Sequence, residues 1–239
     1  MDIILQGLKE GIWLILNFDA EIMQVTILSL QVSLTALIIS ALVGIPSGAV
    51  LALKEVPGKT FLLNTVYTLM GLPPVIAGVI VYLFLTHKGP LGEYGLLFTP
   101  TAMVIAQVLL ACPIILGLTA RAVMSQPQDV YDTAATLGAS RRQAVYTIIR
   151  EARIGIVAAL TTAFGRVIAE VGAVMLVGGN IKGSTRVLTT SIMLETRTGN
   201  FSTALAIGIS LLTISFLINI AIIYLERRSF KHGTSIKIT

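Results

Sequence analysis

Long runs of uncharged, apolar residues constrain the fold of this 239-residue chain more than any other feature. Only 12% of the residues are charged, and the mean hydropathy is +0.88. Several runs reach about 20 residues, enough for a helix to cross ~30 Å of hydrocarbon at ~1.5 Å per residue. A soluble domain of this length would carry more charge on its surface. The chain is therefore predicted to be an all-α, polytopic membrane protein with no large soluble domain.

Breaks in the apolar pattern predict about five transmembrane helices behind a short N-terminal interfacial helix. The interfacial helix is expected within residues 1–21, because Ile3–Phe18 is amphipathic and Trp13 suits the headgroup region; a frayed tail is the alternative. Residues 22–225 would form the membrane domain, and 226–239 a cytoplasmic tail. The spans are expected at Val25–Leu53, Phe61–Leu85, Pro100–Ala120, Ile154–Val177 and Ala204–Leu225.

The distribution of Lys and Arg predicts the orientation. If residues 54–59, 121–153 and the tail share one side, that side holds eleven of the seventeen Lys and Arg, the other side holds five, and Arg166 lies inside a span. Because cytoplasmic loops are enriched in Lys and Arg, the N-terminus is expected outside and the C-terminus in the cytoplasm. The net charge of +5 then indicates loops beside anionic membrane lipid, and no nucleic-acid partner is expected.

A polar segment, Val130–Glu151, interrupts the apolar pattern after the third span. Small residues within it would let a short helix approach a partner closely, and Gly138 would end that helix. Arg141 and Arg142 could face acidic groups of a partner or phospholipid. An ordinary amphipathic loop helix is the alternative interpretation.

The sequence Asp132-Thr133-Ala134-Ala135-Thr136-Leu137-Gly138 resembles the EAA loop of ATP-binding-cassette importer permeases, where the membrane subunit binds its ATPase. Asp132 stands where the family has Glu, Ala134 and Gly138 match, and Arg150-Glu151 replaces a Leu-Pro pair. The resemblance implies a coupling helix within a loop at residues 128–151. The implied ATPase-coupling residues are Asp132, Ala134, Ala135, Gly138, Arg141 and Arg142.

Three further stretches resemble the permeases of molybdate, tungstate and sulfate importers. Gly71–Gly78 is similar to their double-proline segment, and Gly89–Gly92 to the loop that follows it. Ala169–Ala173 and Val177–Thr185 are similar to their GEFGA and GNIPGxT sequences. The departures from these two patterns include Ala169, Val171 and Lys182. Four matches in the right order identify the chain as a member of this group, most similar to tungstate-type permeases.

The resemblance implies a permease subunit of a type I, binding-protein-dependent importer in the inner membrane of a prokaryote. It would work as a homodimer with two ATPase subunits and an extracytoplasmic oxyanion-binding protein, and ATP and Mg would be bound by the ATPase. The chain itself lacks a phosphate-binding Gly-x-x-x-x-Gly-Lys-Ser/Thr motif and clustered acidic or nucleophilic residues. We therefore expect no enzyme activity, catalytic residue, cofactor or metal site in it.

The expected substrate is tungstate, with molybdate and sulfate as alternatives within the same class. A secondary anion transporter would show an internal inverted repeat and several charges inside its spans. A membrane enzyme acting on lipids would show clustered Asp or His at a cytoplasmic rim. We find neither pattern in the sequence.

The sequence predicts one helix break and two groups of candidate translocation-pathway residues. Pro73 and Pro74 lack backbone donors and predict a helix break inside the second span. Arg166 and Glu170 lie four apart, so a continuous helix would place them on one face, where they would either guide an oxyanion or form an ion pair between helices. The hydroxyls of residues 178–201 suit an oxyanion, a solvated loop being the alternative. The predicted pathway residues are Arg166, Glu170, Gly178, Gly179, Asn180, Thr185 and Thr189.

Overall fold

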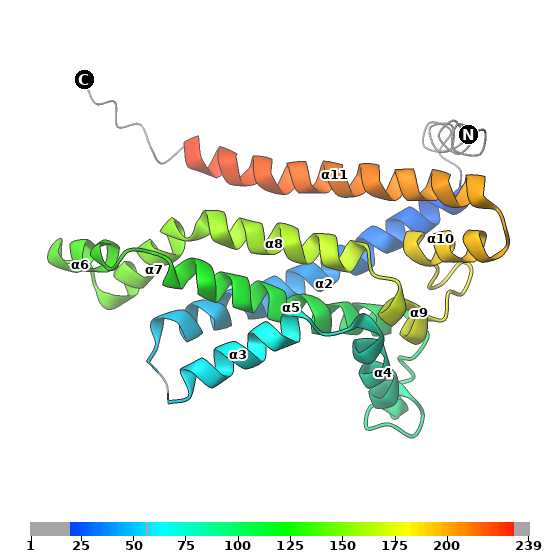
Figure 1. The fold of residues 1–239 in the computed structure, drawn as a ribbon, viewed down its shortest axis with the longest axis horizontal. Helices are drawn as coiled ribbons and strands as arrows, with labels where there is room; N and C mark the ends of the chain where they lie inside the picture. Colours follow the sequence, from blue (N-terminus) through cyan, green and yellow to red (C-terminus); the bar gives the residue numbers. More distant parts are fainter. Residues whose placement is uncertain (1–19, 56, 232–239) are drawn as a thin grey trace. The chain divides into compact units, whose positions relative to one another are not determined.

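The computed structural model describes residues 20–55 and 57–231, so the predicted interfacial helix at Ile3–Phe18 and residues 232–239 of the predicted tail lie outside the described residues. Every regular element in the described part is helical (Figure 1). In chain order the elements are α2 (Ala20–Leu53), α3 (Lys59–Met70), α4 (Pro74–Leu85), the 3-10 turn η1 (Gly92–Tyr94), α5 (Pro100–Met124), α6 (Gln128–Thr136), α7 (Arg141–Glu151), α8 (Arg153–Ile168), α9 (Gly172–Gly178), α10 (Leu188–Arg197) and α11 (Phe201–Lys231).

Three of the described helices are long and apolar enough to cross a membrane alone: α2, α5 and the Phe201–Tyr224 part of α11. Two further pairs pass the same test together, α3 with α4 and α8 with α9, and they are bent by 98° and 55°. The described residues therefore provide three spans, or five if each bent pair is one span. The predicted all-helical membrane fold is confirmed. The second predicted span is broken, as its two prolines predicted, and the fourth is broken where a continuous helix was expected.

The described residues form two compact units, and each is considered separately. The first contains residues 20–39, Leu72–Ala111 and Phe164–Leu217. Here α4 packs along α9 (Figure 1), and a Cβ added to Gly78 of α4 would lie 2.8 Å from Ala173 Cα of α9. A residue without a side chain is what allows the two backbones to come this close. The buried core around this contact comprises Val32, Ala77, Val81, Leu85, Ala102, Met103, Ala106, Leu110, Ala173, Val174, Val177 and Val187.

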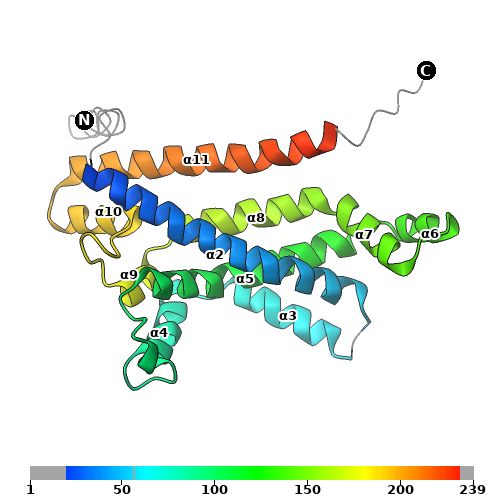
Figure 2. The ribbon, with the colours of Figure 1, turned by 180° about the vertical axis from the view of Figure 1, so that it is seen from behind.

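A second small core in the first unit holds α10. Leu188 of α10 is buried against Val25 of α2 and Ile207 of α11, and Figure 2 shows α10 beside the first turns of both longer helices. The Leu188 N–H, at the start of α10, donates to the Ser29 hydroxyl at 2.8 Å. Because the first N–H groups of a helix have no partner within it, this side chain of α2 fixes where α10 begins.

The second unit contains, among the described residues, Ser40–Gly71, Cys112–Ala163 and residues 218–231. Within it α2 crosses α5 closely, and Gly48 lies at the crossing. A Cβ added there would lie 2.5 Å from the Leu116 carbonyl oxygen. The end of this crossing packs on α7 and α8 through a core of small and branched residues. That core comprises Ala49, Ala52, Ala120, Val123, Ile148, Ala152 and Ile156.

Candidate functional site

The turn between α6 and α7 is tight and projects from the surface. The N–H of Leu137 donates to the Thr133 carbonyl at 3.1 Å, and that of Gly138 to the Ala135 carbonyl at 3.0 Å, so α6 ends within its last turn. Gly138 has φ +84°, in the left-handed region that favours glycine, and a Cβ there would meet nothing within 4 Å. Leu137, next to it, is 82% exposed. The chain therefore turns sharply and presents an apolar side chain outward.

Helix α7 begins in a capping box. The Ser140 hydroxyl accepts from the Gln143 N–H at 3.4 Å, and the Gln143 side chain accepts from the Ser140 N–H at 2.8 Å. Such a cap stabilises a helix start by roughly 1 kcal/mol. It fixes the register of α7 directly after the turn at Gly138, and so fixes which way each following side chain faces.

The two arginines at the start of α7 face different surfaces. Arg141 lines a groove with Val145, Ile148 and Ile149, which follow it at helical spacing. Arg142 lines a shallow hollow on the other side of α7, together with Leu137, Gly138, Ala139, Gln143, Tyr146 and Thr147. The sequence predicted a shared role for Arg141 and Arg142, but the structure separates them.

The other predicted coupling residues lie on α6 and in the turn. Asp132 and Ala135 are exposed, and Ala134 is half-buried. Asp132 lines a second shallow hollow with Asp129, Thr133, Thr136 and Leu137. Leu137 and Tyr146 were not among the residues predicted to couple to a partner, and Tyr146 is 67% exposed. An apolar residue directly before the Gly that ends a polar helix was the available signal for Leu137.

The break between α3 and α4 lies at Gly71, Leu72 and Pro73. Pro73 is the N-cap of α4 with φ −61° and ψ 129°, and Pro74 occupies its first position, where a missing N–H costs nothing. The freed Leu72 carbonyl accepts a long hydrogen bond, 3.5 Å, from the half-buried guanidinium of Arg166. A broken helix is tolerated inside a membrane where protein groups satisfy its backbone, and Arg166 contributes to this here.

The expected alignment of Arg166 and Glu170 on one helix face is wrong. Helix α8 ends at Ile168, so Glu170 lies in the turn before α9. The buried Glu170 carboxylate accepts the Ala173 N–H at 2.9 Å and caps α9. None of the three ion pairs among the described residues joins Arg166 to Glu170. The ion-pair interpretation is therefore also wrong: each residue stabilises a different helix break.

Most of the predicted pathway residues from the end of α9 to the start of α10 have hydrogen-bond partners or close packing contacts within the first unit. The Thr185 hydroxyl accepts the Ile181 N–H at 3.0 Å and donates to the Gly178 carbonyl. The Thr189 hydroxyl donates to the Glu170 carbonyl at 2.8 Å. A Cβ at Gly178 would lie 3.0 Å from Met103, and one at Gly179, where φ is +73°, would lie 2.9 Å from Phe98. Asn180 differs, because its buried side-chain oxygen has no hydrogen-bond partner. A pathway role for these residues stays a prediction.

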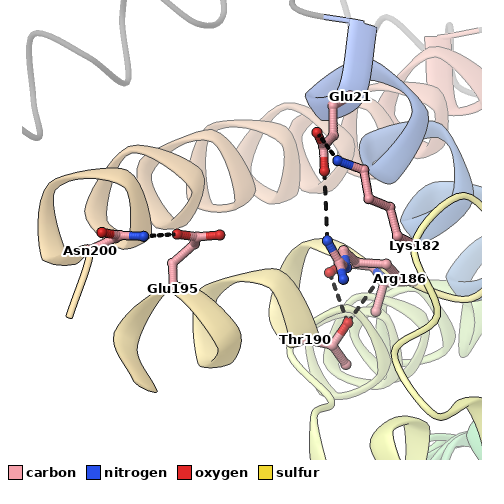
Figure 3. A network of polar contacts seen from close by, with 7 residues as sticks. Glu21, Lys182, Arg186, Thr190, Glu195 and Asn200 are labelled. Atoms are coloured by element: carbon pink, nitrogen blue, oxygen red, sulfur yellow. Dashed lines mark hydrogen bonds and ion pairs between the residues drawn. The ribbon is translucent and has the colours of Figure 1, made fainter. Parts of the chain in front are cut away.

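A cluster of charges, which the sequence analysis did not anticipate, joins the start of α2 to the segment before α10. Glu21 accepts from Lys182 at 2.6 Å and lies 3.6 Å from the Arg186 guanidinium (Figure 3). Arg186 is mostly buried and Lys182 is mostly exposed, with side-chain exposures of 18% and 66%. Lys182 and Arg186 are therefore already neutralised in part by Glu21, which weakens their attraction for a free anion.

Comparisons with known proteins give one matching family and several similar relatives. The family described as "Binding-protein-dependent transport system inner membrane component" matches residues 44–231. The tungstate uptake system permease protein TupB of Peptoclostridium acidaminophilum is 43% identical over 94% of this chain and 98% of its own length. A probable anion ABC transporter permease protein of Haloferax volcanii is 41% identical over 83% of this chain and 88% of its own length.

A solved structure supports the fold independently. The crystal structure of an amino acid ABC transporter with histidines matches 90% of this chain and 96% of that chain, with a TM-score of 0.64 and 16% identity. At this identity the likeness concerns the arrangement of helices alone.

Proposed function

Because the chain belongs to the family of binding-protein-dependent transport system inner membrane components, we propose that it is the permease subunit of an ATP-driven importer for tungstate. It is a multi-pass membrane protein and a transport subunit, not an enzyme. In the proposed machine a separate ATPase binds ATP and Mg, and an extracytoplasmic binding protein delivers the oxyanion. The N-terminus would lie outside and the C-terminus in the cytoplasm, as the excess of Lys and Arg on one side favours.

The observation that carries the importer proposal is the α6–Gly138–α7 turn. Leu137, 82% exposed, and Tyr146, 67% exposed, flank a shallow hollow that also contains Arg142. These apolar groups belong to a polar segment with no membrane-length run, so they are not the lipid-facing residues of a spanning helix. Exposed aromatic and aliphatic anchors beside an Arg are typical of protein interfaces. An ATPase surface with a matching pocket and acidic groups is the partner that this arrangement fits.

We place the homodimer contact of this proposal on an exposed apolar stripe of α4. Val75, Val79 and Leu83 follow each other at intervals of four and are 56%, 43% and 58% exposed. This spacing places them on one side of the helix. A second copy would cover the stripe, and each copy would then bind one of two ATPases. Chemical cross-linking after Val79→Cys, with Tyr224→Cys on α11 as the control, tests this step, and absence of a Val79-linked dimer contradicts it.

The substrate proposal rests on the tungstate permease that matches nearly the full length of this chain at 43% identity. The 41% identical relative is named only as an anion permease, so it leaves the oxyanion open. Molybdate and sulfate remain the alternatives. Uptake of tungstate by the reconstituted importer with its binding protein should resist an equal concentration of molybdate or sulfate. Equal or stronger competition by either would transfer the substrate assignment to that anion.

Co-purification with the genomically neighbouring ATPase tests the coupling turn. We expect wild-type protein to retain the ATPase, and Gly138→Val to lose it, because a β-branched residue is strained at φ +84° and the turn must deform. Gly199→Val is the matched control: Gly199 follows α10, has the same φ of +84°, and its Cβ would also meet nothing within 4 Å. Equal loss of ATPase in both variants would indicate general destabilisation and remove the support for this contact. No ATPase with wild-type protein would overturn the importer and favour a secondary transporter.

A further inference from the structure

A groove of about 740 Å³ lies within the second unit at the ends of α2 and α5. Its far wall is the Arg141 side of α7, and the opposite side of α7 carries Arg142 and faces the hollow that Leu137 also lines. We propose that this groove binds one anionic phospholipid, with the phosphate held by Lys54 and Arg141 and an acyl chain on the apolar floor. The inference does not depend on the ATPase contact, because it concerns the opposite face of α7.

The floor of the groove is apolar and extends along a membrane-spanning helix. Pro46, Val50 and Leu53 of α2 line it, and Val50 is 51% exposed. Pro46 precedes Leu53 by seven residues, so the floor continues roughly 10 Å from the end of α2 toward its middle at ~1.5 Å per residue. Ala49 and Ala52 lie in the same wall, and their small side chains leave the space that the groove occupies. An apolar floor of this kind can pack against an acyl chain, but it offers no hydrogen-bond donor or positive charge to a free inorganic anion.

The rim of the groove is basic. Lys54 directly follows α2, Arg141 starts α7, and both are exposed. The carboxylate at the rim, Glu55, is already paired with Lys59 at 3.3 Å, and Lys59 also donates to the Ala52 carbonyl. None of the ion pairs found among the described residues includes Lys54 or Arg141. Two cations therefore remain available to a phosphate, which Arg can bind through two parallel hydrogen bonds.

Tyr131 of α6 completes the match between groove and lipid. It lines the same groove as the apolar floor and the basic rim, and it is half-buried. A tyrosine with an apolar ring and a polar tip is suited to the level of lipid headgroups. The groove therefore combines an apolar floor, an aromatic ring and two cations, which match the acyl chain, the glycerol region and the phosphate of a phospholipid. A soluble acidic peptide would use the rim but would leave the floor along α2 empty.

The test uses the full chain, purified in detergent with its ATPase and stripped of lipid, and native mass spectrometry with added phosphatidylglycerol or phosphatidylcholine. Wild-type protein should bind one phosphatidylglycerol per chain in preference to phosphatidylcholine. The double variant Lys54→Gln/Arg141→Gln should weaken phosphatidylglycerol binding roughly thirtyfold, the ordinary contribution of two basic groups beside anionic lipid. The control Lys88→Gln/Arg197→Gln removes the same charge from exposed positions outside the groove and should bind as wild type does.

Several results would overturn the proposal. These are an equal loss in both double variants, unchanged binding in Lys54→Gln/Arg141→Gln, and equal binding of the two lipids. Displacement of the lipid by millimolar inorganic phosphate would assign the rim to a free anion, and lipid binding that occurs only after the ATPase is removed would assign the groove to that protein. Val50→Trp, which fills the floor without changing charge, should also reduce binding. The ATPase-to-permease ratio in the same samples separates this outcome from a failure of the coupling proposal, which concerns the opposite side of α7.

Discussion

Replacement of Gly78 by Ala should destabilise the protein, although Ala is the better helix former. In an exposed helix interior this change gains about 0.5–1 kcal/mol. At Gly78 the new methyl would lie 2.8 Å from Ala173 Cα and 3.0 Å from Leu176 Cδ1, so α4 and α9 must separate. Overpacking of this kind costs about 1–3 kcal/mol. We therefore expect the free energy of unfolding to fall by about 1 kcal/mol, because of the collision between α4 and α9.

Gly165→Ala is the matched control, since Gly165 also lies inside a helix, α8, and a Cβ there would meet nothing within 4 Å. It should gain the helix propensity without the collision, so the two variants should differ by about 2 kcal/mol. For a chain of this size that corresponds to roughly 4–8 °C in melting midpoint. Heating in detergent followed by size-exclusion chromatography measures the fraction still folded. Equal shifts in both variants would refute the close approach of α4 and α9.

Two further changes test the caps described above. Glu170→Ala removes the cap of α9 and should lower the melting midpoint, with a loss of about 1 kcal/mol in stability. Glu170→Gln should keep most of that stability, because an amide oxygen can still accept the Ala173 N–H. Equal effects of the two variants would argue against capping. Ser140→Ala should fray the start of α7 at a similar cost in stability. Hydrogen exchange at the Gln143 N–H should then be faster than in the control variant Thr147→Ala. Unchanged exchange would contradict the capping box.

The break at Pro73 and Pro74 was predictable from sequence because its cause is local. A proline lacks the N–H that a helix needs, whatever surrounds it. The second break, at residues 169–171, contains no proline and was missed. It depends on Glu170 capping α9 and on Gly172 packing beside Val75, where a Cβ would lie 3.2 Å from Val75 Cγ2. Such tertiary contacts leave little trace in periodicity, so the fourth span read as one continuous helix.

In the coupling segment, too, the sequence predicts the local backbone but not the surface that each side chain faces. Its residue types and the glycine after α6 predict a short helix and a turn, because both follow from local backbone preferences. The different surfaces of Arg141 and Arg142 depend on the capping box at Ser140 and on the packing of Ile148 against α2 and α5. A sequence pattern gives the angle between two neighbouring side chains on a helix, but not which of them faces the rest of the protein.

Thr189 shows how a predicted pathway role can be separated from a structural one. Its hydroxyl is buried and donates to the carbonyl of Glu170, in the turn that breaks the fourth span. Thr189→Val keeps the shape and removes the donor, which should cost about 1–3 kcal/mol by leaving that carbonyl unpaired. Thr189→Ser keeps the donor and should stay close to wild type. If the hydroxyl serves the helix break, tungstate uptake normalised to folded complex should be the same in both variants, and only the melting midpoint should fall in Thr189→Val. If it serves the oxyanion, normalised uptake should fall in Thr189→Val while the midpoint holds, and the structural role argued here would be refuted.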